Sequence, residues 1–236
     1  MAFWQRKQTR REEYPASDSI RVHIKGLSSD VRIDTARNGH AIVELFTSGD
    51  EKVLAQVQVR YDAEARTLTI DTKGSKLGLF MIQRDSVDVH VVLPEHSDIH
   101  VDVASGDVDA HGRLGDVRIN SASGDIDFKD AEVSSLHIKS ASGDVAAQAG
   151  APTFVDLAAG DIELQVNQPC KVEARTLSGD IEVKIQRGFV TDVNAQTLAG
   201  DISSNINFDR ESGEAEPVQV ELTLSSLSGD IEIERM

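Results

Sequence analysis

The chain has 236 residues, with 24 Lys or Arg against 40 Asp or Glu, so its formal charge is −16. This length accommodates one large all-β domain or two small ones, and 39% hydrophobic with 27% charged residues is typical of a soluble globular protein. The acidic balance argues against a nucleic-acid partner, because binding to phosphates requires a positive surface. A single cysteine, Cys170, excludes an intramolecular disulfide and any multi-cysteine metal site.

Residues 1–17 are predicted to be a flexible basic tail. Their first eleven residues carry four cations and no acid, and Glu12 and Glu13 follow where a signal peptide would have an apolar run. No stretch approaches the roughly 18 apolar residues that a membrane-spanning helix needs. We therefore expect a cytoplasmic chain without a membrane span, whose tail makes at most a weak surface contact through Phe3 and Trp4.

Residues 18–98 are rich in predicted strands but irregular. Alternating or continuous apolar residues predict strands at 20–24, 42–44, 53–61, 68–70 and 87–93. The triplet Ser29-Asp30-Val31 is typical of a degenerate corner, whereas Ser48-Gly49-Asp50 precedes Glu51 instead of an apolar residue and predicts a hairpin turn. We expect this part to begin and cap the repeat array that follows, with a separate small β-domain as the alternative.

Residues 99–236 contain a short repeat of a small residue, glycine, aspartate and a β-branched residue. Its copies centre on Gly106, Gly124, Gly143, Gly160, Gly179, Gly200 and Gly229, with a shortened copy at Gly115. The steps between the seven full copies are 18, 19, 17, 19, 21 and 29 residues, and the longest holds a predicted loop at 209–217. A fold prediction that overlooks a repeat is wrong as a whole, so we base the prediction on this repeat before considering individual strands.

Each position of the repeat has a physical reason. Glycine permits a positive φ at a corner, aspartate can accept hydrogen bonds from corner amides, and the following Val or Ile suits the start of a strand. Side chains two and four residues after the glycine are almost all apolar and should face inward, while those three residues after it should face outward. The eight glycines are therefore predicted to be structural corners.

A strand, a glycine corner, a second strand and a return at about 19 residues predict one coil of a β-solenoid. Apolar residues at helical spacing are missing, and a β-propeller would need about 40 residues per blade. We therefore predict an all-β fold, a single-stranded β-solenoid, and a right-handed β-helix because parallel crossovers are overwhelmingly right-handed.

Acidic side chains recur at two positions of the repeat and should form rows on one outward face. This candidate binding face consists of Asp107, Asp109, Asp125, Asp127, Asp144, Asp161, Glu163, Asp180, Glu182, Asp201, Asp230 and Glu232. Charges about 4.8 Å apart repel by only about 0.9 kcal/mol in water, so the rows are tolerable without a ligand. One interpretation is that each aspartate caps the amides of its own corner; the other is a strip that attracts Ca²⁺ or a polycationic partner.

The chain of S-G-D-[VI] corners resembles the bacterial family of putative adhesins with β-strand repeats, a domain family of unknown function. The resemblance covers roughly residues 18–236 and includes the run Asp85-Ser-Val-Asp-Val-His-Val-Val-Leu-Pro94. It implies a solenoid scaffold and brings no catalytic residues with it.

Catalytic, metal and cofactor sites are not indicated by the sequence. Lys129 and Lys184 are predicted to lie on coils about 14 Å apart, too far to act together in a lyase. Among the histidines, His96 and His100 share a face and His90 and His111 fall on neighbouring coils, an arrangement we interpret as solvated strand residues and not as zinc ligands. Cys170 is interpreted as a small filler at the edge of a coil.

The favoured hypothesis is a non-enzymatic scaffold that binds a protein or cationic ligand through its acidic face. The alternative is a self-assembling structural β-helix, since the last coil, 228–236, would present an open β edge suited to a homodimer. A polysaccharide-active enzyme is the third hypothesis.

Overall fold

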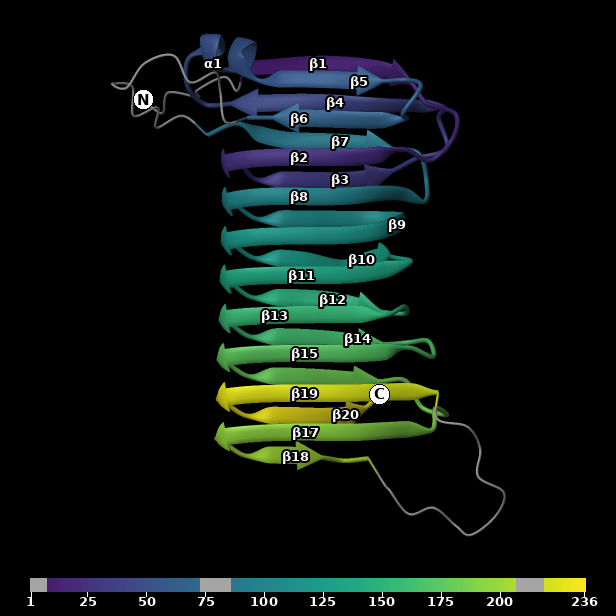
Figure 1. The fold of residues 1–236 in the computed structure, drawn as a ribbon, viewed down its shortest axis with the longest axis vertical. Helices are drawn as coiled ribbons and strands as arrows, with labels where there is room; N and C mark the ends of the chain where they lie inside the picture. Colours follow the sequence, from purple (N-terminus) through teal and green to yellow (C-terminus); the bar gives the residue numbers. More distant parts are fainter. Residues whose placement is uncertain (1–7, 73–85, 207–218) are drawn as a thin grey trace, which may run out of the picture.

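The computed structural model describes residues 8–72, 86–206 and 219–236, which form a tall stack of strands with two main faces (Figure 1). In stacking order, sheet A consists of β1 (Gln8–Pro15), β4 (His40–Thr47), β7 (Asp88–Leu93), β3 (Val31–Thr35), β9 (Val108–Ser123), β10 (Ile126–Glu132), β12 (Val145–Ala149), β14 (Ile162–Val166), β16 (Ile181–Ile185), β20 (Ile231–Arg235) and β18 (Ile202–Ser204). Sheet B consists of β5 (Gln58–Asp62), β6 (Thr67–Asp71), β2 (Arg21–Ser28), β8 (Ser97–Ser105), β9 again, β11 (Ser135–Ser142), β13 (Thr153–Ala159), β15 (Lys171–Ser178), β19 (Val220–Ser228) and β17 (Thr191–Ala199). The helix in the described part of the chain is α1 (Glu51–Gln56).

One coil is a strand of sheet B, a glycine corner and a strand of sheet A. The near strands of Figure 1 run leftward to the corner and the far strands run rightward from it while the chain descends, so the solenoid is right-handed. Strands of successive coils pair in parallel with matched register, as where Ile162 pairs with Val145 and Ile181. The predicted all-β solenoid is confirmed.

The core is a single cluster of stacked aliphatic side chains between the two sheets. Strand β14 alternates buried and half-buried residues, and Ile162 and Leu164 have at most 1% of their surface exposed. Phe128 is the largest fully buried side chain and replaces an aliphatic in the same inward row. The cluster runs from Ala16 to Ile233, so the residues before position 99 share one core with the regular repeats.

The amino-terminal end departs from the sequence prediction in two places. The predicted flexible tail is wrong for Gln8–Pro15, because these residues form β1, which pairs antiparallel with β4; residues 1–7 lie outside the described residues. The predicted hairpin turn at Ser48–Asp50 is also wrong: the Asp50 side chain accepts a hydrogen bond from the Lys52 amide and begins α1. The helix buries Val53 and Leu54, so the predicted strand at 53–61 reduces to β5.

The carboxy-terminal coils do not stack in the order of the sequence. The coil of β19 and β20 pairs on one side with β15 and β16, and on the other side with β17 and β18. The expectation that residues 228–236 form the open edge of the stack is therefore wrong, because this coil is enclosed and the outermost one is β17 with β18. Burial of apolar surface favours this order. Leu222 and Ile231 of the inserted coil are buried, whereas Ile202 of the outer coil is 48% exposed.

A second insertion lies near the other end. The coil of β2 and β3 pairs with β6 and β7 on one side and with β8 and β9 on the other, although β6 and β7 follow it in the chain. Its corner at Ser29 and Asp30 continues the glycine column, since the position of a Cβ on Gly106 lies 2.1 Å from the Ser29 carbonyl oxygen. The prediction of a degenerate corner at Ser29-Asp30-Val31 is thus confirmed.

Gly115 is the predicted corner that the structure contradicts. It lies inside β9 at the opposite edge of the coil, beside Asp98, and it lacks the positive φ of the other corners. The apolar residue before it, Leu114, is buried in the core, whereas the apolar residue two places before each true corner glycine is exposed. The short copy Leu114-Gly-Asp-Val117 therefore shares the letters of the repeat but not its place in the coil.

Candidate functional site

The glycine corners form a column in which successive backbones touch. The seven glycines of the full copies have φ between +115° and +155°, a region that residues with a Cβ rarely adopt. The position of a Cβ on Gly143 lies 2.1 Å from the carbonyl oxygen of Gly124. Glycine is therefore required at these corners both by the backbone conformation and by the distance between coils.

The aspartate after each glycine forms a ladder of hydrogen bonds along the stack, which we call the Asp ladder. The amide of Asp125 donates to Oδ1 of Asp107 at 2.9 Å, and the amide of Asp144 donates to Oδ1 of Asp125 at 2.9 Å. In stacking order the ladder consists of Asp30, Asp107, Asp125, Asp144, Asp161, Asp180, Asp230 and Asp201. Each carboxylate thus satisfies the amide of the next coil, and not that of its own corner as the sequence suggested.

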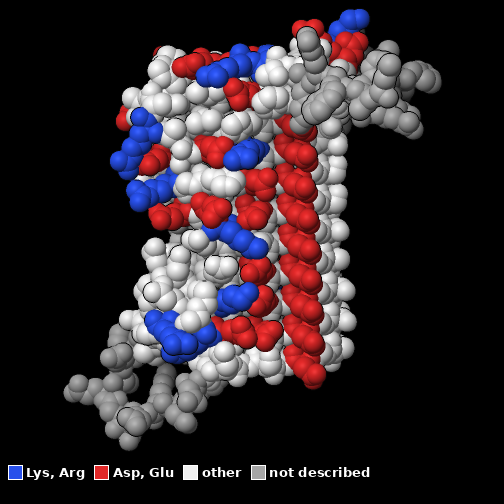
Figure 2. Space-filling view, turned by 180° about the vertical axis from the view of Figure 1, so that it is seen from behind, with Lys and Arg blue, Asp and Glu red and all other residues white. Residues whose placement is uncertain are grey.

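A second acidic row runs beside the Asp ladder on the outer surface of sheet A, and both rows are visible in Figure 2. It consists of Asp109, Asp127, Glu163, Glu182 and Glu232; Ala146 interrupts it, and Ser203 occupies the same position in the coil beyond Glu232. All twelve acidic residues of the predicted face therefore lie on one side of the molecule.

Two lysines meet at the centre of this row, contrary to the sequence prediction that they lie too far apart. Lys129 Nζ lies 2.9 Å from Glu163 Oε2, and Lys184 Nζ lies 3.3 Å from Glu163 Oε1. Lys129 lies on β10 and Glu163 on β14, so this contact spans the intervening strand β12. Hydrogen bonds from Lys129 and then Lys184, against the opposing effect of burial, lower the pKa of Glu163.

An open hollow of about 1060 Å³ lies between the Asp ladder and this row, and we call it the acidic trough. Its acidic lining consists of Asp144, Asp161, Asp180, Asp230, Glu163, Glu182 and Glu232. Lys129 is the one cation among the described lining residues, and Glu232 has no ion pair among the described residues. The trough is therefore a negative surface with regularly spaced carboxylates and no internal counterion for most of them.

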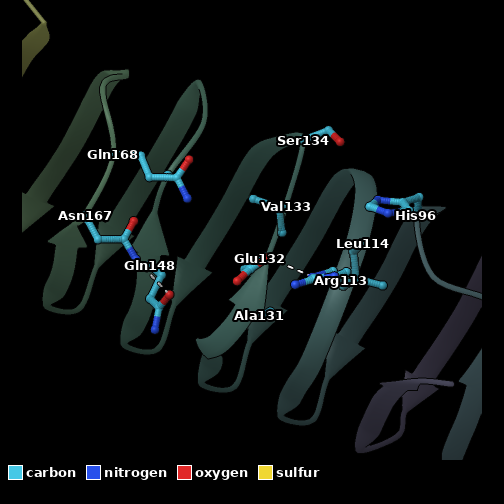
Figure 3. Close-up of a pocket in the computed structure, with 11 residues that line it drawn as sticks. His96, Arg113, Leu114, Ala131, Glu132, Val133, Ser134, Gln148, Asn167 and Gln168 are labelled. Atoms are coloured by element: carbon cyan, nitrogen blue, oxygen red, sulfur yellow. Dashed lines mark hydrogen bonds and ion pairs between the residues drawn. The ribbon is translucent and has the colours of Figure 1, made fainter.

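A second hollow, of about 530 Å³, lies at the opposite edge of the coils, where the turns lengthen along the stack (Figure 3). Two residues separate β10 from β11, three separate β12 from β13 and four separate β14 from β15, so a step forms. The lining pairs Arg113 with Glu132 at 3.1 Å and joins Asn167 to Gln148 at 3.1 Å. Asn167 Oδ1 is buried without a hydrogen-bond partner among the described residues.

This turn hollow was missed at the sequence level. Its amides come from the end of β12 (Gln148) and from the turn after β14 (Asn167 and Gln168), so no spacing rule marks them. The one signal was the recurrence of amide side chains near the ends of successive sheet A strands.

The histidines and the cysteine contact neighbours in the way that structural residues do. His90 lies between Asp34, at 2.7 Å from Nε2, and Glu44, at 3.2 Å from Nδ1, and this joins β7 to β3 and β4. Among the described residues no group of three or more His, Cys, Asp or Glu has the arrangement of a metal site. Burial raises the pKa of Cys170 to about 11, and its thiol donates to the Ala149 carbonyl at 3.3 Å.

The described part of the chain contains no helix of the length and apolarity that crossing a membrane requires.

Comparison with protein families matches residues 18–235 to the family described as Toastrack DUF4097. A search of curated proteins finds no match.

Solved structures of low sequence identity are similar to this chain. A putative adhesin from Bacteroides fragilis is 13% identical over 98% of this chain and 99% of its own, with a TM-score of 0.51. A putative cell adhesion protein from Clostridium sporogenes is 12% identical over 97% and 100%, with a TM-score of 0.42. A putative lipid binding protein from Parabacteroides distasonis is 14% identical over 97% and 96%, with a TM-score of 0.47.

Proposed function

This chain belongs to the Toastrack DUF4097 family, and we propose that it is a non-enzymatic β-solenoid scaffold that binds a cationic partner through the acidic trough and the Asp ladder. The observation that carries the proposal is the fixed repeat of carboxylates on one rigid face. Each ladder bond occupies Oδ1 of one carboxylate, so a negative charge recurs at every coil, about every 4.8 Å.

The partner that fits this face is an extended chain with several positive charges. Individual surface ion pairs contribute only about 0.2–1 kcal/mol, so affinity must come from many contacts along the row. A rigid ladder supplies those contacts without the loss of side-chain freedom that a mobile acidic surface would incur, because each aspartate is already held by an amide. We therefore expect binding that weakens steeply as salt rises.

The test uses fluorescent poly-L-lysine as the probe and substitutions that remove charge but keep the ladder. Asparagine retains an Oδ1 acceptor, so Asp144→Asn, Asp180→Asn and Asp230→Asn in one chain leave the hydrogen bonds in place. This triple variant should bind the probe about tenfold more weakly, since three ion pairs at about 0.5 kcal/mol each are removed.

A control with the same change of charge lies on sheet B. Asp156→Asn, Asp192→Asn and Glu221→Gln remove three acids from β13, β17 and β19. This control should change the affinity less than the trough variant does. Equal losses in the two variants would show that only net charge matters and would refute a site on the acidic face.

Self-assembly end to end is the second candidate, and the structure changes which coil it would use. Strands β17 and β18 each pair with one neighbour among the described residues, so their other edges lack a strand partner there. An edge of this kind is a template for pairing with another chain. Light scattering over a range of concentrations distinguishes this candidate, since assembly predicts a mass that rises with concentration.

A further inference from the structure

A column of apolar side chains runs along the corner directly beside the Asp ladder. At the position two residues before each glycine, or before Ser29 in the first coil, the stack has Leu27, Ala104, Ala122, Ala141, Ala158, Leu177, Leu227 and Leu198. Thr176 pairs with Ser226 and Ser226 with Thr197, so the next residues along these strands lie level with one another. Three leucines therefore occupy three adjacent coils, and we call Leu177, Leu227 and Leu198 the leucine row.

The leucine row is exposed where the other coils have a methyl group. Its side chains are 58%, 48% and 79% exposed respectively. Alanine occupies the same position in four coils and supports the same corner, so packing within the fold does not require leucine there. Contiguous exposed apolar side chains of this kind mark a contact surface.

Each leucine of the row is followed three residues later by an aspartate of the ladder. Asp180, Asp230 and Asp201 form no salt bridge with any described residue. The end of the stack therefore presents an apolar stripe and an unneutralised acidic stripe side by side. A ligand that covers both stripes must carry large apolar groups next to cations.

We propose that residues 1–7 of a second copy of this chain bind the leucine row and its flanking aspartates. The segment reads Met-Ala-Phe-Trp-Gln-Arg-Lys, so Phe3 and Trp4 would cover the leucines while Arg6 and Lys7 face the carboxylates. Within the described residues, the cations of the amino-terminal strand that follow this segment are already paired, Arg11 with Glu44 at 3.2 Å.

The segment cannot cover the leucine row of its own molecule. Gln8 lies in β1 at one end of the stack, and β1 is separated from β16 by about eight strand spacings, or about 38 Å. Seven residues extend at most about 25 Å. The contact is thus between copies, with one end of one molecule meeting the opposite end of another, and such a heterologous contact continues from copy to copy.

Binding is measured with the labelled synthetic peptide Met-Ala-Phe-Trp-Gln-Arg-Lys added to the full chain. In the test variant, Leu177→Ala, Leu227→Ala and Leu198→Ala are combined, which restores the residue that four other coils already have. The control is Leu27→Ala, which removes a leucine of 57% exposure from the same position of the first coil. We expect the triple variant to bind the peptide at least about tenfold more weakly and the control to bind it unchanged.

Two further results separate this proposal from binding of a cationic partner by the acidic trough. The leucine triple variant should still bind poly-L-lysine, because its charges are intact. The mass of the unmodified chain in light scattering should rise with concentration, and Phe3→Ala with Trp4→Ala should abolish the rise. Equal binding of the peptide to the wild type and the triple variant, or a mass independent of concentration, would overturn the proposal.

Discussion

The two ends of the solenoid are built differently. At the amino-terminal end, β1 and β5 run antiparallel to their neighbours and α1 lies beside β1 and β4, and Ala41, Val43 and Leu45 are at most 1% exposed. At the other end the outermost described strands are β17 and β18, which run parallel to the stack and carry smaller inward residues. Antiparallel strands and a helix therefore form one end, whereas the other end is one more parallel coil.

Both ends nevertheless share one device, a coil inserted out of sequence order. The coil of β2 and β3 lies inside that of β6 and β7, and the coil of β19 and β20 lies inside that of β17 and β18. In both cases the inserted coil pairs with a coil that is not its neighbour in sequence: β2 and β3 pair with β6 and β7, and β19 and β20 pair with β15 and β16. Burial of its aliphatic side chains on two sides, rather than proximity along the chain, determines its position.

The largest effect is expected from adding a methyl group to a corner inside the stack. Gly143→Ala should lower the free energy of unfolding by roughly 3 kcal/mol or more, because the new Cβ lies 2.1 Å from the Gly124 carbonyl oxygen at a φ of +115°. Gly200→Ala, in the outermost coil, should cost less, since that coil can move away from its single neighbour. Urea unfolding checks both; equal losses would contradict an open end at β17 and β18.

The coil order itself is tested by two isoleucines at the same register. Ile231 pairs with Ile202, but Ile231 is buried and Ile202 is 48% exposed. Ile231→Ala should therefore cost roughly 3 kcal/mol in the free energy of unfolding, and Ile202→Ala less than about 1 kcal/mol. If the ranking is reversed in thermal or urea unfolding, the coils stack in the order of the sequence.

The closed end depends on a guanidinium that joins the first strand to the helix. Arg10 donates to the carbonyls of Leu54 at 2.7 Å and Val57 at 2.8 Å at the end of the helix, where the Leu54 carbonyl otherwise accepts only a 3.3 Å bond from the Val57 amide within the described residues. Arg10→Ala should cost roughly 1–2 kcal/mol and speed amide exchange in α1 and β1. Arg11→Ala removes the ion pairs of an exposed arginine with Glu44 and Glu13 and provides the matched control, with little change expected.

The smallest expected effect is acid sensitivity at the same end. Burial tends to raise the pKa of Asp34, but hydrogen bonds from His90 and Arg32 outweigh it and hold that pKa below 3.8. Because the folded state holds its proton less tightly than the unfolded state, the stabilisation is complete above about pH 4 and is lost as the pH falls through the lowered pKa. In urea titrations below pH 4, Asp34→Asn should flatten the pH dependence; an unchanged slope would contradict this role.

Much of the fold could be predicted because the residue types of the corner motif are determined by the backbone conformation and close contacts of the corner. Gly143 shows why: only glycine tolerates both its φ and the adjacent carbonyl, so the repeat had to mark a stacking corner. The acidic face followed from alternation after each corner. Both could be derived from residues within one coil.

What could not be predicted depends on contacts between coils. Every corner has the same motif, so the motif does not determine which coil lies next to which. Only the contrast between Leu224 or Ile233 and the smaller Ala195 or Ser204 at the same register indicated the order. The contact of Lys129 with Glu163 spans two strand spacings and depends on side-chain reach, which periodicity does not reveal. Gly115 shows the opposite failure, a matching motif in the wrong place.

The inserted carboxy-terminal coil has a consequence for synthesis. A ribosome makes the chain from its amino terminus, so β17 and β18 emerge before β19 and β20, and the surface of β15 and β16 is then open to the wrong coil. Direct stacking of β17 on β15 would bury less aliphatic surface and would have to be undone when the final residues arrive. We therefore expect a slow phase in maturation that removal of residues 207–236 would eliminate, which makes the order of the coils a kinetic property as well as a structural one.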